Sequence, residues 1–276
     1  LIDLGNSGTG IRLLSGFISG LGLKAKLTGD ESLIKRPMRR VADPLTLMGK
    51  EISTNSGKAP IQIIGGNIKD NFEYVMPIAS AQVKSSLMLA SLSSGNSIKI
   101  TEAKITRDHT EKMIEYLGGS IEVSESSEGK TIFLKNSKLS KISTYEVVGD
   151  FSSAAFIIVA ALISKNSEVL IKNVGLNKTR SGLLEVLLQM NANIEIVNKT
   201  KTCNEDCGDI IVKSSHLEGI NVPNSIIPNI IDEIPILSVA ASFAEGQTII
   251  KNASELKVKE SDRLHATSMG LKTVNI

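Results

Sequence analysis

The chain repeats the same order of elements about every 75 residues, and this repeat limits its possible folds more than any other feature. Similar segments begin at Ser80, Ser152 and Asp232, and a more divergent copy begins at Asn6, so that the starts are 72 to 80 residues apart. This period is too long for most solenoids. Units that each bury helices against their own sheet are therefore expected.

Each copy opens with a polar or small residue followed by an apolar helix, as Val83, Leu87 and Ala90 show by their helical spacing. A Gly or Asn ends this helix, and a strand, a polar loop with a cation, a second helix and a strand pair follow. The predicted strands include 73–76, 97–100, 168–171 and 248–250, with a turn at 124–129. The pattern predicts an α/β (α+β) fold of repeated βαβαββ units. A composition shift at 145–149 predicts two domains, 1–148 and 149–276.

Composition argues against several classes of function. With 3% aromatic residues, no Trp and a net charge of +2, the chain lacks both the stacking platforms and the basic excess of nucleic-acid binders. The longest apolar run, 154–163, is shorter than the roughly 20 residues of a membrane helix. Two cysteines, Cys203 and Cys207, are expected in an exposed hairpin loop without a metal, and their small number favours a reducing cytoplasm.

Small hydrogen-bonding residues begin the first helix of successive copies, at 6–9, 80–82 and 152–153. Helix N-termini present unpaired N–H groups and a partial positive charge, so such starts suit phosphate or carboxylate ligands. Ordinary N-capping is the alternative at each single position.

A cation precedes the second helix of every copy, at Lys35-Arg36, Arg107, Arg180 and Lys259 with Arg263. Recurrence at an equivalent place favours a rim that faces a small anionic ligand over solvated surface charge. Carboxylates next to these cations, at Asp232-Glu233 and Glu260, are candidate proton carriers, although an Asp at a helix start can serve only as a cap. Dinucleotide-binding and P-loop motifs are absent from the sequence.

At these residues the chain resembles the 5-enolpyruvylshikimate-3-phosphate (EPSP) synthases, also called 3-phosphoshikimate 1-carboxyvinyltransferases. The resemblance covers essentially the whole chain through GNSGTGIRLLSG, GDESLIKRPM, ASAQVKSSLMLA, TRDHTEKM, GDFSSAAFIIVAA, DEIPILSVAA and LKVKESDRL. It implies the two-domain enolpyruvyl transferase fold, an inside-out α/β barrel type that closes on substrates in the cleft between its domains. It also implies a cytoplasmic, monomeric transferase of aromatic amino-acid biosynthesis, the target of glyphosate, with no metal or organic cofactor and no nucleic-acid or membrane partner.

In such an enzyme the 5-hydroxyl of shikimate 3-phosphate attacks C2 of phosphoenolpyruvate, and the tetrahedral intermediate expels phosphate. The residues that the resemblance places at shikimate 3-phosphate are Ser80, Ala81, Gln82, Arg107, Asp232 and Lys259. Those that it places at phosphoenolpyruvate are Gly8, Thr9, Arg36, Gln82 and Arg263. The implied catalytic residues are Asp232, which takes the hydroxyl proton, and Glu260 with Lys259, which handle the methylene proton.

The ends of the chain depart from the family pattern. The family's N-terminal motif with a catalytic Lys and its C-terminal segment with a further Arg and Lys are absent, so an internal fragment with little or no turnover is expected. Two other functions stay open. One is a UDP-N-acetylglucosamine enolpyruvyl transferase. That family uses a reactive cysteine in a loop, and neither Cys203 nor Cys207 matches it. The other is a catalytically inactive ligand-binding fragment.

Overall fold

The computed structural model describes residues 1–127 and 129–275 and divides into two compact units, Leu1–Ser143 and Thr144–Ile276. The division falls five residues before the break predicted after residue 148. Each unit contains helices and its own sheet or sheets, so the α/β fold class is confirmed.

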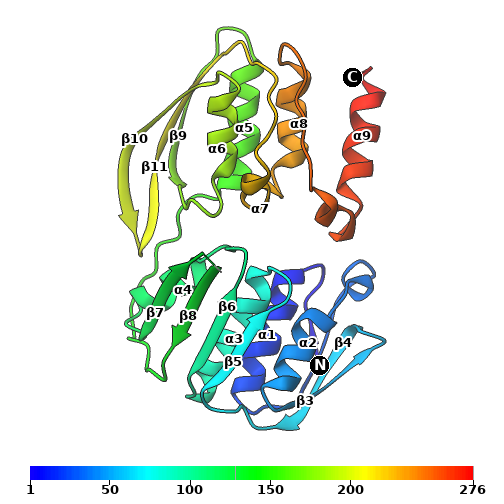
Figure 1. Ribbon diagram of the computed structural model, residues 1–276, viewed down its shortest axis with the longest axis vertical. Coiled ribbons are helices and arrows are strands. Elements are labelled where there is room, and N and C mark those ends of the chain that lie inside the picture. The colour runs from blue at the N-terminus through cyan, green and yellow to red at the C-terminus, as the bar shows by residue number, and fades with distance from the viewer. Residues whose placement is uncertain (128, 276) are drawn as a thin grey trace. The chain divides into compact units, whose positions relative to one another are not determined.

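Unit 1 consists of two successive βαβαββ copies (Figure 1). The first contains β1 (Ile2–Asp3), α1 (Gly8–Gly20), β2 (Ala25–Thr28), the 3-10 turn η1 (Leu33–Lys35), α2 (Arg39–Leu47), β3 (Lys50–Asn55) and β4 (Lys58–Gly66). The second contains β5 (Phe72–Met76), α3 (Ala81–Ser94), β6 (Ile98–Glu102), α4 (His109–Tyr116), β7 (Ile121–Ser126) and β8 (Gly129–Leu134). The predicted order of elements is confirmed in both copies.

Each copy in unit 1 forms a four-stranded mixed sheet, in the orders β1-β2-β4-β3 and β5-β6-β8-β7. The first two strands of each copy, joined through a helix, pair in parallel, and the closing hairpin adds antiparallel partners. Both sheets and the helices share one apolar core, which includes Leu27, Ile61, Leu87 and Ile100. Because β6 ends at Glu102, the loop that follows it begins directly at the carboxyl end of a parallel strand.

Helices α1 and α3 lie side by side in unit 1, in contact through small residues (Figure 1). A Cβ atom added to Gly16 would lie 1.9 Å from the carbonyl oxygen of Ser86, and one added to Gly20 would lie 2.3 Å from that of Ala90. Both pairs are 70 positions apart and advance in the same direction, so the helices are parallel. The absence of side chains at these glycines therefore lets the two helix starts lie at the same end of unit 1.

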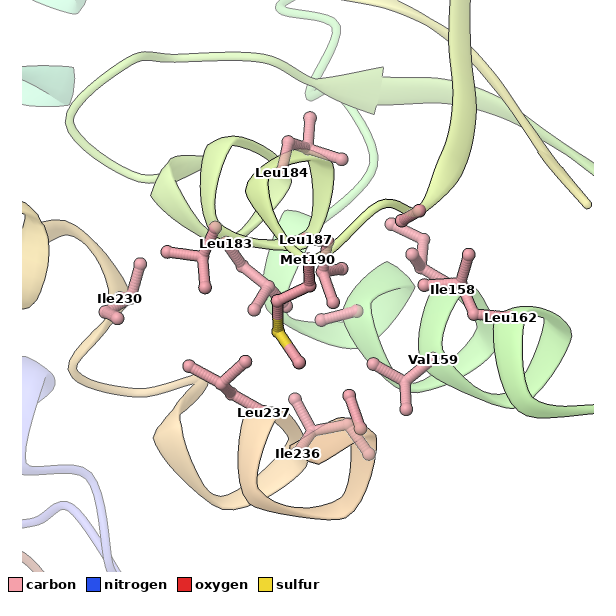
Figure 2. Packing of buried hydrophobic residues seen from close by; sticks show 14 of the residues in the cluster. Ile158, Val159, Leu162, Leu183, Leu184, Leu187, Met190, Ile230, Ile236 and Leu237 are labelled. Atoms are coloured by element: carbon pink, nitrogen blue, oxygen red, sulfur yellow. The ribbon is translucent and has the colours of Figure 1, made fainter. Parts of the chain in front are cut away.

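Unit 2 contains α5 (Phe151–Ile163), β9 (Glu168–Gly175), α6 (Gly182–Gln189), β10 (Asn193–Thr202), β11 (Glu205–Lys213), the 3-10 turn η2 (Asn224–Ile226), α7 (Ile227–Ile230), α8 (Ile234–Ser242), the 3-10 turn η3 (Ser254–Val258) and α9 (Arg263–Thr273). Its sheet has the order β10-β11-β9 and is antiparallel. Figure 2 shows the core, where side chains of α5, α6, α7 and α8 meet around Met190. The apolar run predicted at 154–163 is thus a core helix.

Several local predictions need correction. The strand predicted at 248–250 is reduced to a single bridge between Asn221 and Ile249, because its partner there is a loop and not a strand. The first helix of the third copy starts earlier than predicted: Asp150 is its N-cap, and Ser152 and Ser153 lie in its first turn. The turn predicted at 124–129 is shorter, since β7 continues to residue 126 and β8 begins at 129. Residue 128 lies outside the described residues.

The cysteine prediction is half wrong. Cys203 lies at the hairpin turn between β10 and β11 and is half-buried, whereas Cys207 lies within β11 and is buried. The register of the hairpin explains this, because Cys207 pairs with both neighbouring strands and faces the protein interior. In residues 1–127 and 129–275, no single helix is long and apolar enough to cross a membrane. One bent pair of helices, 224–230 with 234–242, is long and apolar enough when the two are taken together, by length and composition only.

Candidate functional site

The parallel packing of α1 and α3 brings together two helix starts that are far apart in the sequence. Ser7 caps α1 by accepting a hydrogen bond from Gly10 N–H, and Ser80 caps α3 through Val83 N–H. Between them, Gln82 Nε2 donates to Thr9 Oγ1 at 2.7 Å. The predicted residues Gly8 and Ala81 are the first residues of the two helices. Their N–H groups therefore lie at the positive ends of parallel helix dipoles.

Two arginines line these helix starts, and sequence reasoning identified only one of them. Arg36 donates from Nη2 to Asn6 Oδ1 at 2.6 Å, and its Nε is buried without a hydrogen-bond partner among the described residues. Arg12 donates from Nη1 to Gln82 Oε1 at 2.5 Å and from Nη2 to the carbonyl oxygen of Pro37 at 3.3 Å. The spacing could have indicated Arg12, because it lies three residues after Thr9 on the same helical face.

Gly8 lies directly beneath the Arg36 guanidinium. A Cβ atom at this position would lie 2.5 Å from Arg36 Nη1 and 3.4 Å from Arg12 Nη1. A side chain here would displace the guanidinium, so the small residue keeps the positive groups close to the helix start. This supports the predicted close approach of a ligand to Gly8.

Arg107 lies on the loop between β6 and α4 and is half-buried. The preceding residue fixes this loop, because Thr106 Oγ1 donates to Glu102 Oε2 at 2.7 Å. Ser85, one turn beyond Ala81 on α3, hydrogen-bonds with Thr110 at 2.7 Å and so connects α3 with the start of α4. Arg107 is therefore carried by a short segment that is attached at both ends.

The second cluster of predicted residues is centred on Asp232 in unit 2. Asp232 lies in the turn between α7 and α8 and is 20% exposed. Its Oδ1 is 3.1 Å from Arg263 Nη1 and 3.4 Å from Lys259 Nζ, and its Oδ2 is 3.4 Å from Arg180 Nη1. Three cations, one from the loop before α6 and two from the segment 259–263, therefore surround one carboxylate, which they hold in a fixed orientation.

Glu260 belongs to the same cluster through Arg263. Arg263 is the first residue of α9 and donates from Nε to Glu260 Oε1 at 2.6 Å. Lys259 directly follows η3, so the short segment 259–263 supplies two cations and one acid next to Asp232. Next to Asp232, the buried Glu233 accepts a hydrogen bond from Ser152 Oγ, which connects the start of α8 with α5. The structure thus brings together the four predicted site residues of unit 2: Asp232, Lys259, Glu260 and Arg263.

Arg180, one of the predicted loop cations, extends the cluster to Asp150, which was not predicted. Arg180 Nη2 is 3.0 Å from Asp150 Oδ1, so this side chain connects Asp150 with Asp232. Partial burial raises the pKa of Asp150, but hydrogen bonds from Ser153 and Arg180 outweigh it and leave the pKa below its ordinary value. The Asp directly before an apolar helix was a capping signal that could have identified this residue.

In an Asp150→Asn variant the free energy of unfolding at pH 7 is expected to be lower than in the unmodified chain by up to about 1 kcal/mol. Asn keeps the helix cap but not the charge that pairs with Arg180. A depressed folded-state pKa contributes stability above the unfolded pKa of about 4, and this contribution is lost as the pH falls through the folded value. The deficit should therefore vanish at low pH in denaturant titrations. A deficit that is constant down to pH 2 would contradict this expectation. The matched control is Asp262→Asn, which makes the same change at the N-cap of α9.

Both clusters are suited to anions. Unit 1 provides helix N-termini with Arg12, Arg36 and Arg107, and unit 2 provides cations around Asp232. Arginine can grip phosphate or carboxylate through two parallel hydrogen bonds, and lysine acts as a compact charge. Within residues 1–127 and 129–275, no group of three or more His, Cys, Asp or Glu side chains is arranged to hold a metal ion.

Comparison with known proteins agrees with these features. The profile of the family described as EPSP synthase (3-phosphoshikimate 1-carboxyvinyltransferase) matches residues 1–276. Curated 3-phosphoshikimate 1-carboxyvinyltransferases from Bartonella quintana and Legionella pneumophila (strain Lens) are 45% and 43% identical, over 98% and 100% of the chain. The chain spans 62% and 63% of their lengths. A solved EPSP synthase structure from Acinetobacter baumannii matches with a TM-score of 0.83 and 42% identity, covering 98% of this chain and 60% of that one.

Proposed function

Since the chain belongs to the EPSP synthase family, we propose that it takes part in the transfer of the enolpyruvyl group of phosphoenolpyruvate to the 5-hydroxyl of shikimate 3-phosphate. The observation that carries the proposal is that predicted residues gather in two places. Gly8, Thr9, Arg36, Ala81 and Gln82 lie at two neighbouring helix starts, and Asp232, Lys259, Glu260 and Arg263 form a second cluster. The relatives named above are longer than this chain, so the proposal concerns the contribution of these residues to the reaction.

Charge compensation is the first contribution. Each substrate combines a phosphate of about −1.5 to −2 with a carboxylate, so the two repel each other strongly. At an effective dielectric constant of 20, two unit charges 4 Å apart interact by about 4 kcal/mol, so several cations are required. Arg12, Arg36 and Arg107 meet this requirement in unit 1, and the helix starts add N–H donors. Gln82 accepts a hydrogen bond from Arg12 and donates one to Thr9, so it is suited to orient a substrate hydroxyl.

Proton transfer is the second contribution. Attack of the 5-hydroxyl oxygen on C2 forms a C–O bond and breaks the C2–C3 π bond of phosphoenolpyruvate. The hydroxyl loses its proton, and the methylene carbon gains one. In this proposal the Asp232 carboxylate accepts the first proton, and its three cationic neighbours fix its orientation. Glu260 and Lys259 deliver the proton to the methylene carbon. They take a proton back from that carbon when the C2–O bond to phosphate breaks and the C2–C3 double bond forms again. Arg263, which contacts both acids, compensates the charge of the departing phosphate.

Calorimetric titration of this chain with shikimate 3-phosphate tests the proposal. Saturable binding at one site per chain is expected, with much weaker binding of unphosphorylated shikimate because the arginines then lack their phosphate partner. UDP-N-acetylglucosamine is the control ligand for the alternative enolpyruvyl transferase. A folded chain that binds the nucleotide sugar and ignores shikimate 3-phosphate would overturn the proposal. Release of phosphate with both substrates present would show whether binding leads to turnover.

A further inference from the structure

Unit 1 buries a group of charged side chains that the proposed reaction does not use. Lys84 lies on α3 with its side chain fully buried, and its Nζ is 3.1 Å from Glu102 Oε1 and 2.6 Å from Glu111 Oε1. Glu102 is also fully buried, and the Glu111 side chain is 5% exposed. Two carboxylates therefore share one ammonium group inside the protein.

This arrangement is costly for stability alone. Burial raises the pKa of Glu111, and the charge and hydrogen bond of Lys84 offset this only in part. Apolar side chains of similar volume often replace buried ion pairs without loss of stability, so a buried cluster of this kind is weak support for a purely stabilising role. Lys130, which is 4.0 Å from Asp108 and also contributes to the charge around Glu111, adds a further ion pair on the same side.

The position of the cluster indicates a different role. Lys84 N–H donates to the carbonyl oxygen of Ser80, so Lys84 belongs to the first turn of α3, whose start carries Ser80, Ala81 and Gln82. Glu102 is the last residue of β6, and Glu111 lies in the first turn of α4. The cluster thus joins the start of α3 to both ends of the loop 103–108, which carries Arg107.

Thr106 extends the cluster to the loop itself. Its hydroxyl donates to Glu102 Oε2, while Glu102 Oε1 accepts from Lys84 Nζ. The two oxygens of one buried carboxylate therefore connect the residue next to Arg107 with the first turn of α3. A hydrogen bond to a charged acceptor in a buried place is strong and directional.

We propose that Lys84, Glu102, Glu111 and Thr106 are positioning residues that hold Arg107 at a fixed distance from the start of α3, so that both meet one phosphate-bearing substrate. The inference rests on the proposed function, because it names what fixes the geometry of the shikimate 3-phosphate site. These four residues touch no substrate and act through Arg107 and the α3 N–H groups.

Thr106→Val tests this inference, because valine keeps the shape of threonine and removes only the hydroxyl. The matched control is Thr101→Val, where the lost hydroxyl contact is with Thr131 on the neighbouring strand, at 3.3 Å. Loss of a hydrogen bond to a charged group corresponds to about tenfold in an equilibrium constant. The dissociation constant of shikimate 3-phosphate should therefore rise about tenfold in Thr106→Val and stay nearly unchanged in Thr101→Val.

Hydrogen exchange provides a second readout that needs no ligand. Backbone amides of 103–110 should exchange faster in Thr106→Val than in the unmodified chain, whereas those of α1 should not, because only the loop loses its attachment. Equal exchange in this loop and an equal dissociation constant would each overturn the inference. If the unmodified chain binds no shikimate 3-phosphate, the proposed function fails, and the exchange data still decide whether Thr106 fixes the loop.

Discussion

Arg107→Ala is expected to weaken the binding of shikimate 3-phosphate to this chain by about 100-fold, or roughly 2.7 kcal/mol, because the proposed function has this guanidinium bind the phosphate through two charge-assisted hydrogen bonds. The helix starts at Gly8 and Ala81 remain intact in this variant, so some affinity should persist. Isothermal titration calorimetry of both proteins in the same low-salt buffer measures the difference.

Lys24→Ala is the matched control for this substitution, since it removes the same charge from an exposed residue just beyond the C-terminal end of α1, away from the helix start at Gly8. It should change affinity only slightly, through long-range attraction that salt screens. A loss of affinity in Lys24→Ala equal to that in Arg107→Ala would show that net charge, and not the placement of Arg107, determines binding. Circular dichroism of both variants checks that unit 1 is folded.

Gly16→Ala is expected to destabilise unit 1 by about 3 kcal/mol or more, because the new methyl group would lie within 1.9 Å of the carbonyl oxygen of Ser86. Backbone cannot rotate away as a flexible side chain can, so α1 must separate from α3. The hydrogen bond between Gln82 and Thr9 should weaken at the same time, which lowers the affinity for shikimate 3-phosphate. Denaturant titration measures the loss of stability.

The same substitution at Gly270 separates packing from helix propensity. Gly270 is exposed within α9, and a Cβ atom there would meet nothing within 4 Å. Alanine should therefore stabilise α9 by about 0.5–1 kcal/mol through its higher helix propensity. Stabilisation by Gly16→Ala as well would refute the close packing of α1 and α3.

The repeat allowed most of the fold to be predicted, because each element is encoded locally. Gly95 and Asn166 adopt positive φ after the first helices of their copies, as the predicted Gly or Asn breaks require. The prediction was wrong where tertiary contacts decide the outcome. The residues 248–250 have strand-like composition, yet they meet only a loop and form a single bridge. Cys207 was predicted to be exposed because the length of the hairpin is not visible in its sequence.

The candidate site was predictable where a motif carries it and not where distant residues combine. The helix starts and loop cations follow from local spacing, and their roles at the substrates stay predictions. The position of Arg12 depends on Gln82, 70 residues away in the sequence. The burial of Lys84 depends on partners 18 and 27 residues away. Lys84 in particular would be placed on the surface by its residue type, since lysine is almost never fully buried without a partner. Its burial becomes understandable only when Glu102 and Glu111 are seen beside it.

The two units have separate apolar cores, since the residues of one core lie within 2–134 and those of the other within 151–264. Two cooperative unfolding transitions are therefore expected, and a single melting temperature would then not describe this chain. The chain contains no tryptophan. A single tryptophan introduced into either unit would therefore give a fluorescence signal from that unit alone, and the stability of unit 1 could be followed separately from that of unit 2.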